Sequence, residues 1–201
     1  MNSLIVFKNN LRVQDNPVLF YGSKGNNIIP VYIHDESYIN KTLGAASKYW
    51  MHNALVSLDN SLENKMMFFR GKTLSILNDL IDQYSIKKIF CEEPFLKHDL
   101  LLYAKLKSFL KNRKIDLCSF NCTLLWEPYS ILKADGTPYK IFTPYYRKGC
   151  LDKIVPIKPL GKPIKIDYAD VINLTTISDL KLLDKIEWYQ KFNNLWEISE
   201  E

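Results

Sequence analysis

Residues 4–33 have the sequence LIVFKNNLRVQDNPVLFYGSKGNNIIPVYI, and this stretch decides the fold. It begins with a short apolar run, Leu4–Phe7, and ends with a second one, Ile28–Ile33. Between them, Asn16 followed by Pro17 is typical of a helix start, because Asn caps helices and Pro suits their first turn. Apolar runs without polar alternation indicate strands buried on both faces, as in a parallel sheet covered by helices. The stretch therefore predicts a strand, a helix and a second, parallel strand.

The same alternation continues to residue 120. Three further short apolar runs predict strands, at residues 66–69, 88–91 and 115–120. Apolar residues at helical spacing predict helices around residues 51–62, 74–84 and 102–109. Repeated strand–helix alternation is typical of an open α/β sheet with right-handed crossovers. We therefore expect a Rossmann-like, open five-stranded parallel sheet with helices on both faces, followed by an extended linker.

The chain beyond residue 121 departs from this pattern. Prolines and turn residues interrupt it up to Pro163, and only a weakly helical stretch follows, over residues 178–196. We therefore expect an α/β domain over residues 1–147 and a linker over residues 148–201. Such a linker is too short to form a core of its own, so we expect apolar residues in it to be exposed, such as Leu182, Leu183, Trp188 and Trp196.

The composition is that of a globular protein. Of the 201 residues, 47% are hydrophobic and 24% charged, enough for a core without disulfides or metals. No apolar run approaches the ~20 residues of a membrane-spanning helix, and no basic leader starts the chain. We therefore expect a soluble cytoplasmic protein without membrane contact. We also expect no metal site and four free thiols, at Cys91, Cys118, Cys122 and Cys150.

The net charge of +5 is unevenly distributed. Residues 133–165 carry eight Lys and Arg against Asp135 and Asp152, whereas residues 166–201 carry three Lys against eight Asp and Glu. A basic stretch of this kind can bind a phosphate backbone. The alternative is that both segments lie over surface of opposite charge.

Polar residues that follow two of the predicted strands are the candidates for ligand binding. Glu92 and Glu93 come directly after the strand at 88–91, and His34 and Asp35 come after the strand at 28–33. Ligands of open parallel sheets bind beyond the carboxyl ends of the strands, near the point where the strand order reverses. Lys48, at the start of the next helix, is a further candidate. Without the strand order, the sequence does not say whether these residues form one site.

Two nucleotide-binding motifs are absent. Gly71-Lys72-Thr73 follows a strand and precedes a helix, but Met66 stands where a phosphate-binding loop needs glycine. A G-x-G-x-x-G fingerprint is also missing. We interpret Gly71–Thr73 as a turn.

Four stretches together resemble one family. Residues 11–19, LRVQDNPVL, are similar to an R-x-x-D-N-P-A-L segment, and residues 136–145, GTPYKIFTPY, are similar to G-x-P-Y-x-V-F-T-P-F. Residues 44–55 and 180–201 are similar to the helix after the second strand and to the linker that ends in W-x-x-G-E-x-G-A. In this order and spacing the segments resemble the amino-terminal part of DNA photolyases and cryptochromes.

The resemblance implies an antenna-type α/β domain that holds a folate or a deazaflavin chromophore. We place that chromophore at His34, Asp35, Lys48, Glu92 and Glu93. In this family a helical domain binds FAD and receives the damaged DNA. No stretch here resembles that domain, so we expect no catalytic and no FAD-binding residues in this chain. Light-dependent DNA repair would need a helical FAD-binding chain as partner. This chain would bind DNA only weakly or through that partner.

Three alternatives stay open. The chain could be a free-standing nucleotide-binding α/β protein with its ligand near Glu92. It could be an inactive truncated fragment or an interaction module. This part of the family also does not separate a repair enzyme from a signalling cryptochrome.

Overall fold

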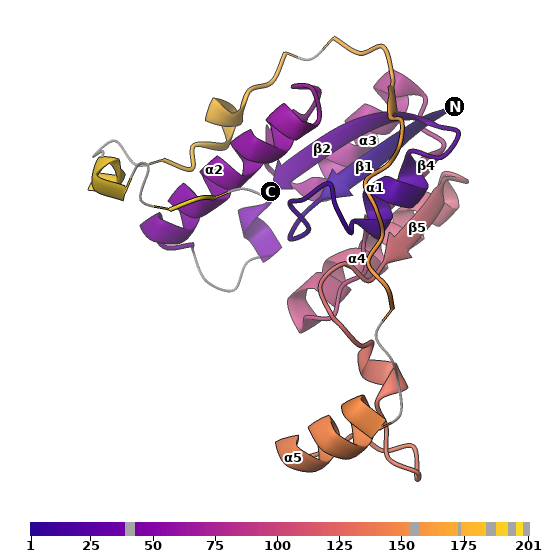
Figure 1. The fold of residues 1–201 in the computed structure, drawn as a ribbon. Helices are drawn as coiled ribbons and strands as arrows, with labels where there is room; N and C mark the ends of the chain where they lie inside the picture. The colour runs from indigo at the N-terminus through magenta and orange to yellow at the C-terminus, as the bar shows by residue number, and fades with distance from the viewer. Residues whose placement is uncertain (39–42, 153–156, 173, 184–187, 193–195, 199–201) are drawn as a thin grey trace. The chain divides into compact units, whose positions relative to one another are not determined.

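The computed structural model describes residues 1–38, 43–152, 157–172, 174–183, 188–192 and 196–198. It contains a parallel sheet and flanking helices (Figure 1). The five long strands are β1 (Asn2–Phe7), β2 (Asn27–His34), β3 (Met67–Arg70), β4 (Lys88–Glu92) and β5 (Asp116–Phe120). The main helices are α1 (Pro17–Gly22), α2 (Ala45–Ser61), α3 (Thr73–Tyr84) and α4 (Lys97–Asn112). These elements confirm the predicted strands and helices.

The sheet has the strand order β3-β2-β1-β4-β5, and all its pairings are parallel. On β1, Ile5 pairs with Pro30 of β2 on one side and with Phe90 of β4 on the other. The predicted open parallel sheet is therefore confirmed, and β1 is its central strand.

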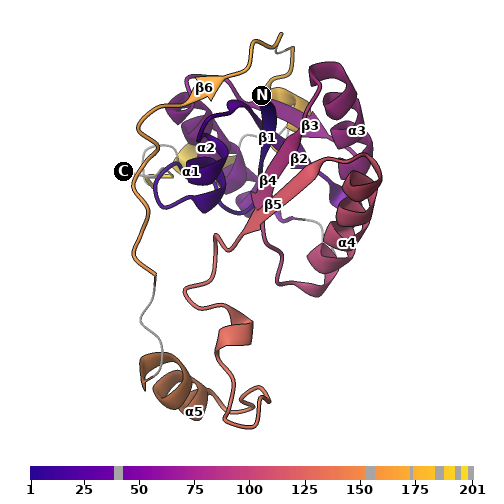
Figure 2. The same cartoon turned by 90° about the vertical axis from the view of Figure 1, so that its right-hand side faces the viewer.

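Helices cover both faces of the sheet (Figure 2). Side chains alternate between faces along a strand, so Ile5 and Phe7 of β1 join one core cluster and Leu4 joins the other. The first cluster includes α1 and α2 residues, and the second includes α3 and α4 residues. Their helical members are Val18, Leu19, Leu55 and Leu58 on one face, with Leu62 directly after α2, and Leu77, Leu80, Ile81, Leu106 and Leu110 on the other.

The segment after residue 160 packs onto the sheet, which the sequence did not predict. A short strand, β6 (Asp167–Tyr168), pairs in parallel with the start of β2. Leu180 and Leu182 are 0% and 3% exposed and belong to the α1–α2 core cluster. The expectation of exposure is therefore wrong for Leu182, whereas Trp196 is 65% exposed and Leu183 and Trp188 are half-buried. The sequence does not predict this packing, because a two-residue strand and isolated leucines show no hydrophobic periodicity.

The chain divides into two compact units. Unit 1 consists of residues 1–122 and 161–201, and unit 2 of residues 123–160. This division differs from the boundary that we placed between residues 147 and 148. The difference arises because Ile166, Leu180 and Leu182 join the core of the sheet, whereas the preceding loop and helix pack among themselves. Unit 2 contains α5 (Phe142–Pro144), which continues into a π-helical segment, Tyr145–Leu151.

Within the described ranges, no helix is long and apolar enough to cross a membrane.

Candidate functional site

The order of the strands places a switch point at β1. The chain moves from β1 to β2 and β3 on one side, and then returns past β1 to β4 and β5 on the other. β1 and β4 are neighbouring strands, and the connections that follow them lead to opposite edges of the sheet, toward β2 after β1 and toward β5 after β4. Ligands of doubly wound sheets bind in the crevice that such loops form. In this fold the crevice therefore corresponds to the carboxyl ends of β1 and β4.

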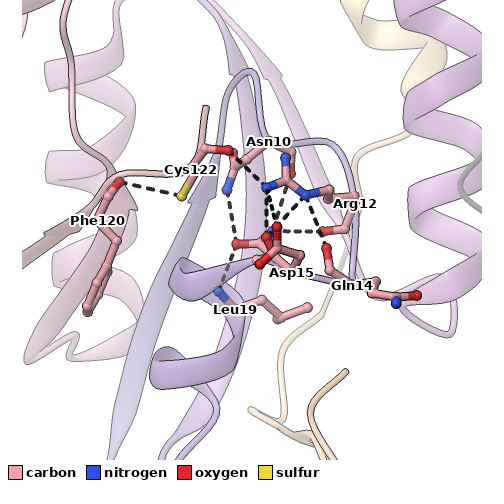
Figure 3. A network of polar contacts seen from close by, with 8 residues as sticks. Asn10, Arg12, Gln14, Asp15, Leu19, Phe120 and Cys122 are labelled. Carbon is pink, nitrogen blue, oxygen red and sulfur yellow. Dashed lines mark hydrogen bonds and ion pairs between the residues drawn. The ribbon is translucent and has the colours of Figure 1, made fainter. Parts of the chain in front are cut away.

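A network of buried amides holds the loop after β1 in shape (Figure 3). The Asn10 and Asn16 side chains are fully buried, and Asn10 Nδ2 donates to Asn16 Oδ1 at 3.2 Å. The same Asn16 oxygen accepts from the backbone N–H of Leu19 at 3.1 Å, which confirms the predicted helix cap. Asn16 Nδ2 donates to the carbonyl oxygen of Arg12 at 2.7 Å. These bonds satisfy the polar groups that the loop buries beside the sheet.

The guanidinium group of Arg12 completes this network (Figure 3). Its nitrogens donate to the carbonyl oxygens of Gln14 and Asp15 at 3.1 and 2.7 Å, and to that of Cys122 at 2.9 Å. Asp15 has a φ of +49°, a left-handed conformation that Asp tolerates better than most residues. The segment 11–19 is therefore a structural clamp: its side chains hold the loop after β1 in shape and bind it to the chain just beyond β5.

Two carboxylates lie at the end of β4. The Glu92 side chain accepts a hydrogen bond at Oε2 from the backbone N–H of Asn9, at 3.1 Å. The backbone N–H of Glu93 donates to the carbonyl oxygen of Phe120 at 2.7 Å. Glu93, the first residue after β4, therefore still lies beside β5. Both glutamates are half-buried. The Glu92 side chain thus connects the end of β4 to the loop after β1, at the point where the strand order reverses.

A third carboxylate beside the switch point was missed by the sequence analysis. Asp99, in the first turn of α4, is 8% exposed and forms an ion pair with Lys8, which follows β1. His98 Nε2 lies 3.3 Å from the same Asp99 oxygen. An acidic residue in a first helical turn is a common sequence feature with a favourable dipole interaction. Its position opposite Lys8 depends on the pairing of β1 with β4, which the sequence does not state.

His34 lies at the end of β2, on the other side of β1. It is 4% exposed, and its Nε2 lies 3.4 Å from Oε1 of Glu36. The other Glu36 oxygen accepts from Arg70, at the end of β3, at 3.0 Å. Burial lowers the pKa of His34, Glu36 opposes this effect, and the positive charges of Arg70 and Lys48 add to it. A neutral imidazole is therefore favoured here.

Asp35 connects the end of β2 to the start of α3. Its Oδ2 accepts from the backbone N–H and the hydroxyl of Thr73 at 2.7 and 2.8 Å, and its Oδ1 accepts from the backbone N–H of Ser37 at 3.0 Å. Burial raises the pKa of Asp35, but the bonds from Ser37 and Thr73 outweigh burial, so the pKa lies below its ordinary value. The Asp35 carboxylate thus binds the backbone at Thr73, in the predicted turn Gly71–Thr73.

The five residues that the sequence proposed fall into two groups. His34 and Asp35, with the charge of Lys48 nearby, lie at the end of β2. Glu92 and Glu93 lie at the end of β4. Strand β1 separates the two groups, and the loop after β1 bonds to Glu92. The geometry thus brings Glu92 together with Asn9 and, through the same loop, with the Lys8–Asp99 pair.

These features define a class: a doubly wound α/β domain whose strand order reverses at β1. The family model for DNA photolyase matches residues 3–163. The chain belongs to the DNA photolyase family.

Curated relatives include repair enzymes and photoreceptors. The chain is 28% identical over 96% of its length to the deoxyribodipyrimidine photo-lyase of Agrobacterium fabrum, of which it covers 41%. It is 27% identical over 84% of its length to Cryptochrome-1 of Arabidopsis thaliana, of which it covers 26%. The chain therefore spans less than half the length of these relatives.

A solved structure supports the same assignment. The class III photolyase of Agrobacterium tumefaciens superimposes with a TM-score of 0.87 at 28% identity, over 97% of this chain and 41% of that protein. The shared part is the amino-terminal portion, so the chain corresponds to the antenna-type domain of a photolyase-like protein.

Proposed function

We propose that this chain holds a light-harvesting chromophore, a reduced folate or a deazaflavin, at the carboxyl edge of its sheet. Members of the family bind FAD and antenna chromophores. The observation that carries the proposal is the hydrogen bond from the Asn9 N–H to Glu92, which fixes a carboxylate at the switch point. A bound chromophore would supply absorption of near-ultraviolet or blue light and would pass the energy to a flavin.

The donor set at this edge suits such a ring system. A pterin or deazaflavin ring carries amide and amine N–H groups, and the carboxylates of Glu92 and Glu93 can accept from them. Lys48 can meet an acidic tail, since a lysine ammonium pairs with carboxylates. His34 and Asp35 bind within the chain, to Glu36 and Thr73, and would shape the β2 side of the site.

The wider activity of the protein is part of the same proposal. With a helical FAD-binding domain as partner, the pair would repair pyrimidine dimers in light. This chain would contribute the antenna and would bind DNA through that partner. The cytoplasmic location inferred from the sequence stays a prediction.

A fluorescence titration tests the chromophore site. A reduced folate and a deazaflavin are titrated separately into the purified chain, with Glu92→Ala, Glu93→Ala and Lys48→Ala as variants. We expect micromolar binding of one chromophore, weakened about tenfold or more by Glu92→Ala, a loss of ~1.4 kcal/mol. Asp116→Asn serves as a matched control, because Asp116 is an exposed acid at the opposite, amino end of β5.

The results separate the alternatives. Equal binding by wild type and all three variants would remove these residues from the site. Binding of neither chromophore at millimolar concentration would contradict the antenna function. Saturable binding of an adenine nucleotide in its place would favour the nucleotide-binding alternative.

A further inference from the structure

Lys8 is held in place at both ends of the residue. It follows directly after β1, the strand at which the strand order reverses. Its backbone N–H donates to Asn10 Oδ1 at 3.2 Å. Its ammonium group forms an ion pair with the carboxylate of Asp99, in the first turn of α4. The loop after β1 therefore fixes the backbone of Lys8, and α4 fixes its charge.

The contact between α4 and the sheet changes character along the helix. Further along α4, Leu106 and Leu110 belong to the same core cluster as Leu4 and Ile89 of the sheet. Asp99, near the start of the helix, is buried as well. A buried ion pair stabilises a fold no more than apolar side chains of similar volume would. Packing of α4 therefore does not by itself explain why a charged pair stands at this end of the contact.

The Lys8 ammonium group retains hydrogen-bond donors for a ligand. The Lys8 side chain is 46% exposed, whereas the Asp99 side chain is 9% exposed. A lysine ammonium group has three donors, and the bond to Asp99 uses one of them. Because Asp99 already restrains this flexible side chain, a ligand that binds Lys8 loses less conformational entropy than it would with a free lysine.

Lys8 and Glu92 bring opposite charges to the same end of the sheet. Glu92 accepts a hydrogen bond from the backbone N–H of Asn9, the residue next to Lys8, at 3.1 Å. Both charges also reach Cys91 of β4. Burial is the largest influence on the Cys91 thiol and raises its pKa to about 12, while the charge of Glu92 raises this pKa further and that of Lys8 lowers it. A cation and a carboxylate therefore lie together at the switch point.

We infer that Lys8 donates a hydrogen bond to a ring carbonyl of the chromophore, and that Asp99 is the positioning residue that holds Lys8 for this contact. The inference rests on the proposed function. Pterin and deazaflavin rings carry a carbonyl oxygen beside an N–H group, so a site that fits either ring offers a donor as well as acceptors. The ionised carboxylates of Glu92 and Glu93 are acceptors only. Lys8 supplies the donor that these two residues lack.

Substitutions at Lys8 and Asp99 test the inference in the same fluorescence titration. Lys8→Met removes the ammonium group but keeps the length of the side chain, and we expect it to weaken chromophore binding about tenfold or more. Asp99→Asn should weaken binding about threefold, because Lys8 remains but is less restrained. The double variant should bind like Lys8→Met alone, since Asp99 acts through Lys8 and the two effects are not additive.

The absorption spectrum of the bound chromophore provides a second measurement. A cation beside a ring carbonyl shifts the absorption band of the ring. This shift should be present in wild type and in Lys8→Arg, which keeps the charge, and it should be absent in Lys8→Met. A merely structural contribution of Lys8 would not change the spectrum of the chromophore that still binds.

Lys88→Met is the matched control. Lys88 is also a lysine in an ion pair, with Asp116 at 4.0 Å, but it lies at the amino end of β4, opposite the proposed site. This variant should leave binding and absorption unchanged, and circular dichroism should show that all variants are folded.

The outcomes distinguish the inference from the proposed function. If Lys8→Met binds the chromophore like wild type while Glu92→Ala does not, Lys8 is not a contact, and the proposed function stands. If the effects of Lys8→Met and Asp99→Asn add, Asp99 is not a positioning residue for Lys8. If wild type binds neither chromophore, the proposed function fails and the inference fails with it.

Discussion

The guanidinium group of Arg12 donates a hydrogen bond of 2.9 Å to the carbonyl oxygen of Cys122, 110 residues further along the chain. The bond ties the loop after β1, at the centre of the sheet, to a residue that lies two positions beyond the edge strand β5. The first stretch of sequence that resembles the photolyases thus has a structural function, because it holds the loop that carries Lys8 and Asn9.

Replacing Arg12 should destabilise the fold. Arg12→Ala would leave the carbonyl groups of Asp15 and Cys122 without their charged donor, at a cost of about 2 kcal/mol. Arg12→Lys should recover only part of this, because an ammonium group cannot reproduce the planar fork of donors. Urea unfolding followed by circular dichroism measures both changes. Unchanged midpoints would show that the clamp contributes nothing to stability.

Two leucines of the carboxyl-terminal segment should differ strongly in their effect on stability. Leu180→Ala removes a fully buried side chain from the α1–α2 core cluster and should cost about 2–4 kcal/mol. Leu174→Ala changes a side chain that is 85% exposed, so its effect should stay within about 0.5 kcal/mol. Thermal unfolding of the two variants provides the comparison. Equal effects would show that the segment is a passive linker.

The stability of the protein should decrease as the pH falls below about 6.5. The pKa of His34 is lowered by burial, so the unfolded chain binds a proton before the folded protein does. Where the unfolded state binds more protons, stability rises with pH and is lost on acidification. Burial lowers the pKa of His52 in the same direction.

Denaturant titrations at pH values from 8 to 5 measure this effect. The free energy of unfolding should vary less with pH in His34→Gln than in wild type, and less again with His52→Gln added. Parallel pH profiles for all three proteins would contradict the assignment.

The cysteines should differ in reactivity. Burial raises the pKa of Cys91 to about 12 and that of Cys122 to about 11, so neither forms a thiolate at pH 8. Cys118 is only half-buried. Iodoacetamide at pH 8 should therefore modify Cys118 first, as peptide mass spectrometry would show. Modification in urea, where all four thiols are accessible, gives the reference rates, and early labelling of Cys91 in the native protein would refute the prediction.

Several features follow from the sequence because their causes are local. Asn16 caps α1 wherever the chain forms that helix, since the bond to the Leu19 N–H spans three residues. The run Leu4–Phe7 is apolar at every position, which favours a strand covered on both faces. The family assignment also came from short segments, at residues 11–19 and 136–145.

The arrangement of the candidate site was decided by tertiary structure. His34 and Glu92 are each the last residue of a strand, but only the order β2-β1-β4 separates them and brings Glu92 to the Asn9 N–H. Asp99 faces Lys8 for the same reason. Pairing between strands is a non-local choice that depends on how all the crossovers pack, and a hydrophobic pattern records only which faces are buried.

The carboxyl-terminal segment shows the same limit most clearly. By its composition it resembles a linker, with prolines and opposed charge blocks, and nothing periodic marks Leu180 or Leu182 as core residues. They are buried because the sheet and α2 leave apolar surface that only a distant segment of the chain can reach. The sequence by itself therefore determined the family, the strands and the helices, whereas long-range packing decided which residues meet at the site and which complete the core.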